Sequence, residues 1–107
     1  MNHKVYLTDG AERDLLDIYD YVAVCDTPGK ADDLLEKLEA TCDKLTYSPK
    51  KGHIVPELKR VDVDLYRELH YKPYRIIYGI EGKKIYVYAI LDGRRDLQSL
   101  LERRLLR

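Results

Sequence analysis

The part of this sequence that most restricts its fold is a run of three strand-like segments in the second half of the chain. Residues 66–71, 74–80 and 84–91 are rich in β-branched and aromatic side chains, which predicts three β-strands. Pro73 separates the first two, since proline cannot donate to a β-ladder. Gly82 favours a tight turn between the last two. Strands joined by such short connections run antiparallel.

Two amphipathic helices are expected before these strands. Apolar residues recur at intervals of three and four over 9–25 and again over 28–47, which is the period of one helix face. Asp9 is expected to cap the first helix, because a glutamate follows it in capping-box spacing. Thr27 is expected to cap the second helix, with Pro28 at the first helical position. The short connection makes the pair an antiparallel hairpin.

The remaining segments complete a single expected domain over 1–107. Residues 3–7 are expected to form a first strand, residues 48–65 a connector without a clear period, and Asp96 can cap a final helix. The expected order is β-α-α-β-β-β-α. An amphipathic hairpin must bury its apolar stripes, and one face of the sheet is the available surface. The predicted fold class is therefore α+β, with a helical hairpin packed on a small, mainly antiparallel sheet.

Cys25 and Cys42 are expected to be free thiols. In a hairpin that turns near residues 27–29, Cys42 lies roughly 17 Å beyond the residue that faces Cys25, at about 1.5 Å per residue. That separation is too long for a disulfide, and two cysteines without neighbouring histidines make a poor zinc site. Both are expected to be small core residues. No metal site and no cofactor are predicted.

The chain has no net charge, but its two halves differ. Residues 1–47 carry 5 Lys or Arg against 11 Asp or Glu, a net charge of −6, whereas residues 48–107 carry 14 against 8, a net charge of +6. This split predicts two faces with different partners, the basic one suited to nucleic acid or another acidic target. The alternative is that the helices are simply acid-rich on their solvent side. No membrane span or secretory signal is recognised, so a cytoplasmic location is expected.

Four arginines stand out by their positions. Arg67 and Arg75 lie inside predicted strands, and Arg94 and Arg95 directly follow the last strand. An arginine in a strand needs an anion or an exposed sheet face. Hairpin pairing places Arg75 opposite about Ala89, so we expect the arginines to converge at one edge of the sheet, with Arg67 further from that edge than the others. The alternative is that the two strand arginines are structural. Their partners would then be Glu57, Glu68 or Asp92.

Several motifs resemble the RelE/ParE superfamily of toxins from type II toxin–antitoxin systems. They are GHIVPEL (52–58), YREL (66–69), YRIIYGI (74–80) and IYVYAILDGRRDLQSLLERRL (85–105). The most specific part is YRIIY followed by a strand that ends in GRRD. The resemblance covers nearly the whole chain. It implies a growth-inhibiting toxin of a plasmid stabilisation module, which a cognate antitoxin neutralises in a toxin–antitoxin hetero-oligomer.

The superfamily has two known activities. RelE-like members cleave mRNA on the ribosome, a metal-independent reaction that needs a base, a phosphate stabiliser and an acid. ParE-like members poison DNA gyrase. If the chain is an endoribonuclease, the resemblance implies that Arg75 holds the scissile phosphate and that Arg94 occupies the basic position after the last strand. Glu57 is then a candidate base, and Arg67 is a further catalytic candidate.

Departures from the enzyme pattern favour the ParE-like branch. Tyr66 and Glu68 stand where RelE-like enzymes have lysines, Leu100 stands in place of a tyrosine, and Asp92 in place of a histidine. His70 is a candidate substitute, although a lone strand histidine is more often a surface residue. The preferred hypothesis is a toxin that binds gyrase, and the alternatives are a ribosome-dependent mRNA endonuclease and a non-toxic relative that only binds antitoxin. The predicted target-binding residues are Arg67, Arg75, Arg94 and Arg95.

Overall fold

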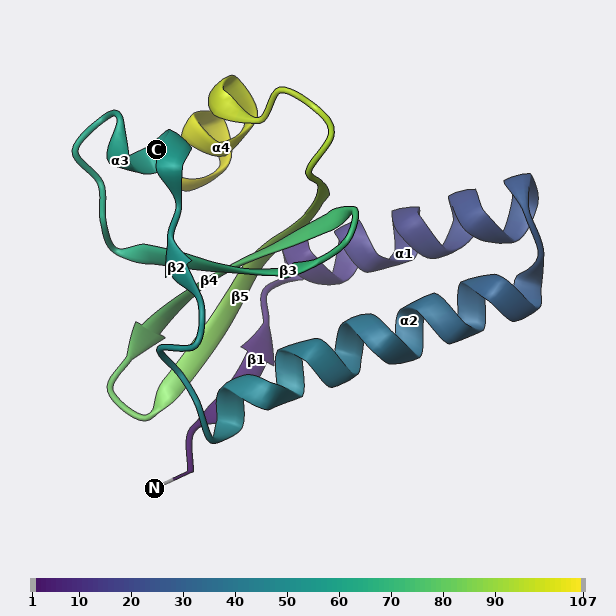
Figure 1. Ribbon diagram of the computed structural model, residues 1–107, viewed down its shortest axis with the longest axis horizontal. Helices are drawn as coiled ribbons and strands as arrows, with labels where there is room; N and C mark the ends of the chain where they lie inside the picture. The colour runs from purple at the N-terminus through teal and green to yellow at the C-terminus, as the bar shows by residue number, and fades with distance from the viewer. Residues whose placement is uncertain (1, 107) are drawn as a thin grey trace.

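The computed structural model describes residues 2–106. In it, helices pack on both faces of one sheet (Figure 1). The helices are α1 (Asp9–Cys25), α2 (Pro28–Asp43), α3 (Pro56–Lys59) and α4 (Gln98–Leu105), with a 3-10 turn, η1 (Lys44–Thr46), after α2. The strands are β1 (Lys4–Leu7), β2 (His53–Ile54), β3 (Tyr66–Tyr71), β4 (Tyr74–Glu81) and β5 (Lys84–Asp92). Their order is β1-β5-β4-β3-β2, with β1 parallel to β5 and the other pairs antiparallel. The predicted α+β class and the helical hairpin on a mainly antiparallel sheet are confirmed.

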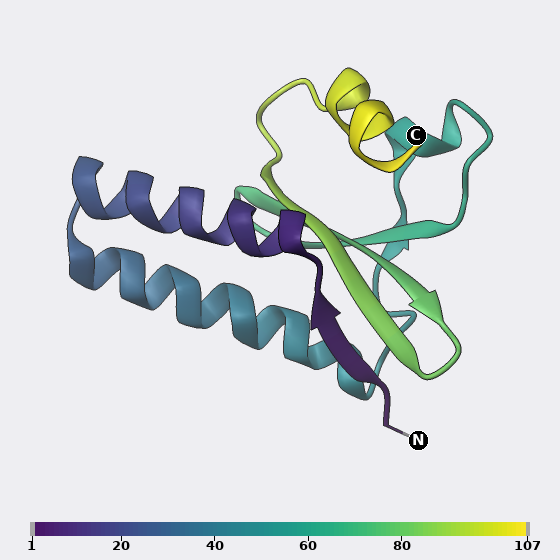
Figure 2. The ribbon, with the colours of Figure 1, turned by 180° about the vertical axis from the view of Figure 1, so that it is seen from behind.

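Helices cover both faces of the sheet (Figures 1 and 2), and a separate apolar core lies on each face. The hairpin of α1 and α2 covers one face, where Leu38, Ile76 and Tyr78 are fully buried. The short helices α3 and α4 cover the other face, where Ile77 and Leu101 are fully buried. Successive residues of β4 therefore enter different cores, as the alternation of its side chains requires. Within residues 2–106, no helix has the length and apolar character that a membrane span needs.

The hairpin extends beyond the edge of the sheet, so its tip is less buried than the sequence predicts (Figure 1). Cys42 is buried, as expected, but Cys25 near the tip is exposed, so its predicted place in the core is wrong. Both thiols are free, as predicted. Val24 is also exposed, at 84%. The apolar stripe of α1 therefore contacts the sheet only through its first half, because the strands end before the helix does.

The helix ends differ slightly from the prediction. Thr8, not Asp9, caps α1: its hydroxyl accepts from the Ala11 N–H at 3.2 Å. Thr27 caps α2 as predicted, but that helix ends at Asp43 and tightens into η1. The carboxylate of Asp96 accepts from the Gln98 N–H at 3.2 Å, although Leu97 is the residue at the N-cap position of α4. Each difference shifts a boundary by a few residues and leaves the packing unchanged.

A β-bulge in β5 alters the predicted register of the central hairpin. Tyr78 pairs with Val87, but Ile77 pairs with Ala89, so Tyr88 is an extra residue in β5. Residues on the two sides of the bulge consequently alternate in opposite phase. Val87 packs under the helical hairpin, whereas Ala89 packs under α3 and α4.

The turn and the bulge each shift the partner of Arg75 by one residue from its predicted position, because Glu81 pairs with Lys84 across a two-residue turn. Arg75 lies opposite Leu91, not opposite Ala89, and Tyr74 lies opposite Asp92. The register therefore brings Arg75 to within one residue of the end of β5. Arg75 therefore lies closer to the segment that carries Arg94 than counting along the hairpin predicted.

The connector over 48–65 contains two elements that the sequence did not predict. Residues 53 and 54 form β2, which pairs with β3. Helix α3 follows, and both its N-cap residue Val55 and its Leu58 are fully buried. Tyr78 holds the start of this connector: its hydroxyl donates to the Pro49 carbonyl at 2.7 Å and accepts from the Gly52 N–H at 3.0 Å. A Cβ at position 52 would lie 2.3 Å from the Glu68 carbonyl oxygen, so this close approach requires glycine.

Candidate functional site

The strand arginine Arg75 is held by two carboxylates on the α3–α4 side of the sheet. Its Nη1 donates to Glu57 Oε2 at 2.6 Å and its Nη2 to Glu57 Oε1 at 2.7 Å. Its Nε donates to Glu68 Oε1 at 2.6 Å, and its Nη2 also reaches Glu68 Oε2 at 3.1 Å. Glu57 comes from α3 and Glu68 from β3, so the arginine joins three elements. We call Arg75, Glu57, Glu68, His53 and His70 the Arg75 network.

Burial strengthens these contacts. The Arg75 and Glu57 side chains are only 13% and 15% exposed, and that of Glu68 is 2% exposed. Hydrogen bonds from Arg75 lower the pKa of Glu57, with burial opposing them. The same bond to Glu57 raises the pKa of Arg75, so its charge is permanent. The pairing with Glu57 and Glu68 that the structural alternative for Arg75 expects is therefore present.

Two histidines complete the network around Glu68. His70 Nε2 lies 2.9 Å from Glu68 Oε1, and His53 Nε2 lies 3.6 Å from Glu68 Oε2. The two rings contact edge to face with centroids 5.3 Å apart. His70 thus shares a face with Glu68, as strand alternation predicts. The sequence did not place His53 here, because that required the two-residue strand β2. The only sequence signal is that His53 and Ile54 precede the buried Val55, a short β-favouring run ahead of Pro56.

Arg94 and Arg95 lie in an exposed loop after β5, which we call the arginine loop (residues 92–96). Arg94 is tied to Asp92 within the loop: its Nε donates to Oδ1 at 3.0 Å and its Nη2 to Oδ2 at 2.6 Å. The side chain and backbone of Arg94 together lower the pKa of Asp92 to about 2. The Arg94 side chain is nevertheless 74% exposed. The loop therefore presents two arginine side chains to solvent.

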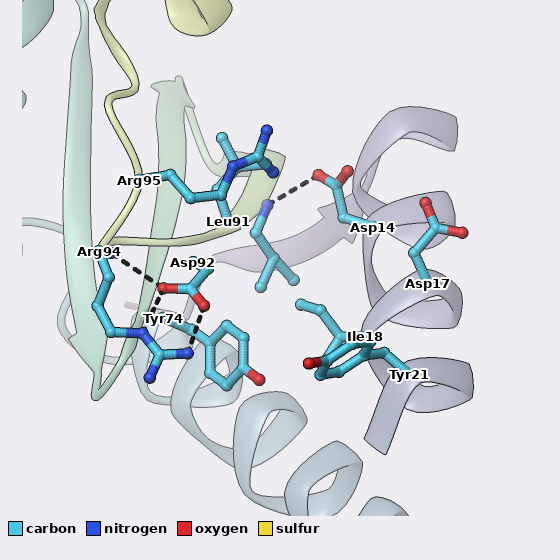
Figure 3. A pocket seen from close by; sticks show the side chains of 10 residues that line it. Asp14, Asp17, Ile18, Tyr21, Tyr74, Leu91, Asp92, Arg94 and Arg95 are labelled. Carbon is cyan, nitrogen blue, oxygen red and sulfur yellow. Dashed lines mark hydrogen bonds and ion pairs between the residues drawn. The ribbon is translucent and has the colours of Figure 1, made fainter. Parts of the chain in front are cut away.

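A pocket of about 290 Å³ lies between the arginine loop and helix α1 (Figure 3). Its wall on α1 carries Asp14, Asp17 and Tyr21, and Figure 3 shows Asp92 and Arg94 on the opposite side. The pocket thus has acidic side chains on one wall and arginines on the other. Asp14 is engaged with the fold, because its Oδ2 accepts from the Ile90 N–H and its Oδ1 from Arg104 Nη1, both at 2.9 Å.

A second pocket of about 300 Å³ lies on the other side of the arginine loop. It is lined by the β3–β4 turn and by the loop. Its lining residues are His70, Lys72, Pro73, Tyr74, Arg75, Gly93 and Arg94. The predicted convergence of Arg75 with Arg94 is therefore present. Arg95 lines the first pocket, on the α1 side of the loop.

Arg67 lies apart from the other three arginines. It pairs in register with Tyr78, which faces the hairpin core, whereas Arg75 pairs with Leu91, which faces the α3–α4 core. The two arginines therefore project from opposite faces of the sheet. Arg67 Nη1 donates to the Gly52 carbonyl at 2.8 Å, and no ion pair of Arg67 is found within residues 2–106. The expected cluster of four arginines thus reduces to Arg75, Arg94 and Arg95.

Comparison with solved structures defines the class of protein. The fold is similar to the chromosomal ParDE toxin–antitoxin system from P. aeruginosa, with a TM-score of 0.69 and 24% identity over 82% of this chain and 92% of that chain. It is also similar to the RelBE2 toxin–antitoxin complex from Mycobacterium tuberculosis, with a TM-score of 0.63 and 17% identity over 86% of this chain and 92% of that chain. The protein therefore has the RelE/ParE-like fold.

The family follows from the sequence comparison. A model of the ParE toxin of the type II toxin–antitoxin system, parDE, matches residues 5–97. The chain belongs to this ParE toxin family. A comparison with curated proteins gives no match.

Proposed function

We propose that this protein is a cytoplasmic toxin that inhibits growth by binding DNA gyrase, without chemistry of its own. The observation that carries the proposal is the state of Arg75. A ribonuclease of this fold needs a strand arginine free to hold a phosphate, but the Arg75 guanidinium already makes four hydrogen bonds to Glu57 and Glu68. Withdrawing it would leave two poorly solvated carboxylates unpaired, which is costly. Membership of the ParE family supports the same branch.

The arginine loop is the proposed contact surface for gyrase. Arg94 and Arg95 are exposed and adjacent, and they border the pocket beside α1. The Arg94–Asp92 pair is solvent-exposed, so exchanging Asp92 for a carboxylate on a partner costs little. Arginine is suited to such contacts because its planar guanidinium binds carboxylates in a bidentate manner. Arg75 supports this surface from beneath: a Cβ at position 93 would lie 2.8 Å from its Cδ.

We also infer that a cognate antitoxin neutralises the toxin. Both similar solved structures are described as toxin–antitoxin systems. Helix α1 offers a suitable surface, because its Leu16, Tyr21 and Val24 side chains are 63–84% exposed. Apolar side chains on an exposed helix suit a partner segment that inserts its own apolar anchors. The acidic residues of α1 favour lysine or arginine beside those anchors.

The test compares growth and gyrase activity in matched variants. The double variant Arg94→Ala/Arg95→Ala is expected to abolish growth inhibition and inhibition of gyrase supercoiling by purified protein, while antitoxin binding remains. Arg103→Ala removes an exposed arginine from α4 and is the control, expected to be as toxic as the wild type. Full toxicity in the double variant would remove the arginine loop from the proposal.

One observation favours ribosome-dependent mRNA cleavage as a second candidate. The pocket over the β3–β4 turn gathers His70, Lys72 and Arg94 beside Arg75. These side chains include an imidazole, which could take part in proton transfer, and cations for a phosphate. Mapping of mRNA ends in a translating extract separates the two functions. Cuts at defined codons that disappear in His70→Ala, with supercoiling unaffected, would replace the gyrase proposal with this one.

A further inference from the structure

Two histidines and a buried carboxylate meet where the edge strand β2 pairs with β3. His53 pairs in register with Glu68, and His70 lies two residues further along β3 on the same face. One possible ligand atom from each of the three side chains lies within 4.8 Å of the others. The imidazoles are exposed, at 65% and 47%, whereas the carboxylate is 2% exposed. The cluster is thus open to ions from solvent on its histidine side.

The charges around Glu68 do not balance. Glu57 and Glu68 together carry two negative charges, and Arg75, which both contact, carries one positive charge. These three groups have a net charge of −1. A carboxylate that is almost fully buried needs compensation for its charge. The open side, where both histidine Nε2 atoms face Glu68, is the place where a cation can supply it.

We propose that His53, Glu68 and His70 form a binding site for a divalent transition-metal ion, of which Zn²⁺ fits best. Imidazole nitrogens with one carboxylate oxygen suit zinc, whereas Mg²⁺ and Ca²⁺ prefer oxygen ligands. Tetrahedral bonds of about 2.0–2.2 Å place neighbouring ligand atoms roughly 3.3–3.6 Å apart. The observed Nε2–Oε separations of 2.9 and 3.6 Å lie close to that spacing, so small side-chain movements admit the ion.

The consequence is a cross-link between β2 and β3. His53 lies in the two-residue strand β2, which directly precedes α3, and Glu68 and His70 lie in β3. The ion would hold this segment against the sheet and thereby support Glu57, which α3 presents to Arg75. Arg75 keeps its bonds to both oxygens of Glu68, because each oxygen accepts one hydrogen bond from Arg75 and has a second lone pair for the metal. A ligand that binds only the folded state raises stability.

The experiment uses tag-free full-length protein, stripped of metal by a chelator, in a Cys25→Ser background that removes the exposed thiol. Calorimetric titration with ZnCl₂ is expected to give one equivalent, and binding of CoCl₂ is expected to give the absorption bands of a tetrahedral site. His53→Ala and His70→Ala are each expected to weaken Zn²⁺ binding at least tenfold. His3→Gln changes the third histidine of the chain, beside β1 at the opposite edge of the sheet, and is expected to bind within twofold of the parent.

Thermal unfolding gives a second readout. Zn²⁺ is expected to raise the midpoint of the parent and of His3→Gln, but not that of the double variant His53→Ala/His70→Ala. Because both histidines are exposed, their replacement is expected to leave the fold intact. The histidine variants therefore test the site even if replacing the buried ligand, as in Glu68→Gln, prevents folding. Absence of Zn²⁺ uptake by the parent at 100-fold excess, or unchanged affinity in the double variant, would overturn the proposal.

Discussion

Arg75 and Glu57 face each other through two parallel hydrogen bonds, Nη1 to Oε2 at 2.6 Å and Nη2 to Oε1 at 2.7 Å. Arg75 belongs to the central strand β4, and Glu57 belongs to the short helix α3. The pair therefore fastens the connector between the helical hairpin and the sheet to the middle of the molecule. It also engages the one strand arginine that the ribonuclease hypothesis needs for a phosphate.

Replacing Arg75 is expected to destabilise the fold. Arg75→Ala leaves Glu57 and Glu68 without their shared cation, so the free energy of unfolding should fall by about 3–5 kcal/mol in urea titrations. The control is Arg60→Ala, an exposed arginine whose bond to Gln98 should be worth about 1 kcal/mol or less. Glu57→Gln should recover part of the loss when combined with Arg75→Ala. A loss below 1 kcal/mol for Arg75→Ala alone would contradict this account.

Truncating the centre of the hairpin stripe is expected to create a cavity. Leu38 is fully buried between α2 and the sheet, and Leu38→Ala should cost about 2–5 kcal/mol in the same measurement. Leu16 on α1 is 63% exposed and provides the matched control, since Leu16→Ala removes the same atoms from solvent-facing surface. Equal losses in the two variants would show that the hairpin does not pack on the sheet as described.

The arginine loop should lose its internal ion pair in acid. Bonds from Arg94 lower the pKa of Asp92 from 3.8 to about 2 in the folded protein. Because the folded pKa lies below the unfolded one, the stabilisation by Asp92 is present above pH 3.8 and is lost as the pH falls to about 2. Carboxyl-carbon NMR titration should show this midpoint directly. Arg94→Ala should return it toward 3.8, and an unchanged midpoint in that variant would assign the shift to another cause.

Charge on α1 should affect affinity for the antitoxin. Asp17 and Asp20 are exposed, and reversing both to lysine is expected to weaken antitoxin binding about tenfold at low salt and less at high salt. Asp14 is unsuitable for this test because its carboxylate accepts from Arg104 and from the Ile90 N–H. Glu81→Lys reverses an exposed charge at the end of β4 and should leave affinity unchanged. Salt-independent affinity in the double variant would remove the electrostatic part of the interaction.

The elements with long, regular periods were predictable. The alternation in β3 gave its bounds at Tyr66 and Tyr71, and Thr27 with Pro28 marked the start of α2. The two-residue strand β2 was not predictable, because it has no period of its own and is defined by its ladder to β3. The arginines were predicted only in part. The sequence placed Arg75 and Arg94 near each other, but it also grouped Arg67 with them, although Arg67 lies on the opposite face of the sheet from Arg75.

The sequence by itself determined the helical hairpin, the three antiparallel strands and the family, because these depend on local periodicity and on short motifs. Tertiary structure decided the chemistry of the site. Pairing of His53 with Glu68 and the approach of α3 to β4 join residues that lie far apart in the chain, and no local pattern encodes such contacts. The same strand arginine is free or engaged according to whether a carboxylate from α3 reaches it. In this protein Glu57 does reach it, at 2.6 Å.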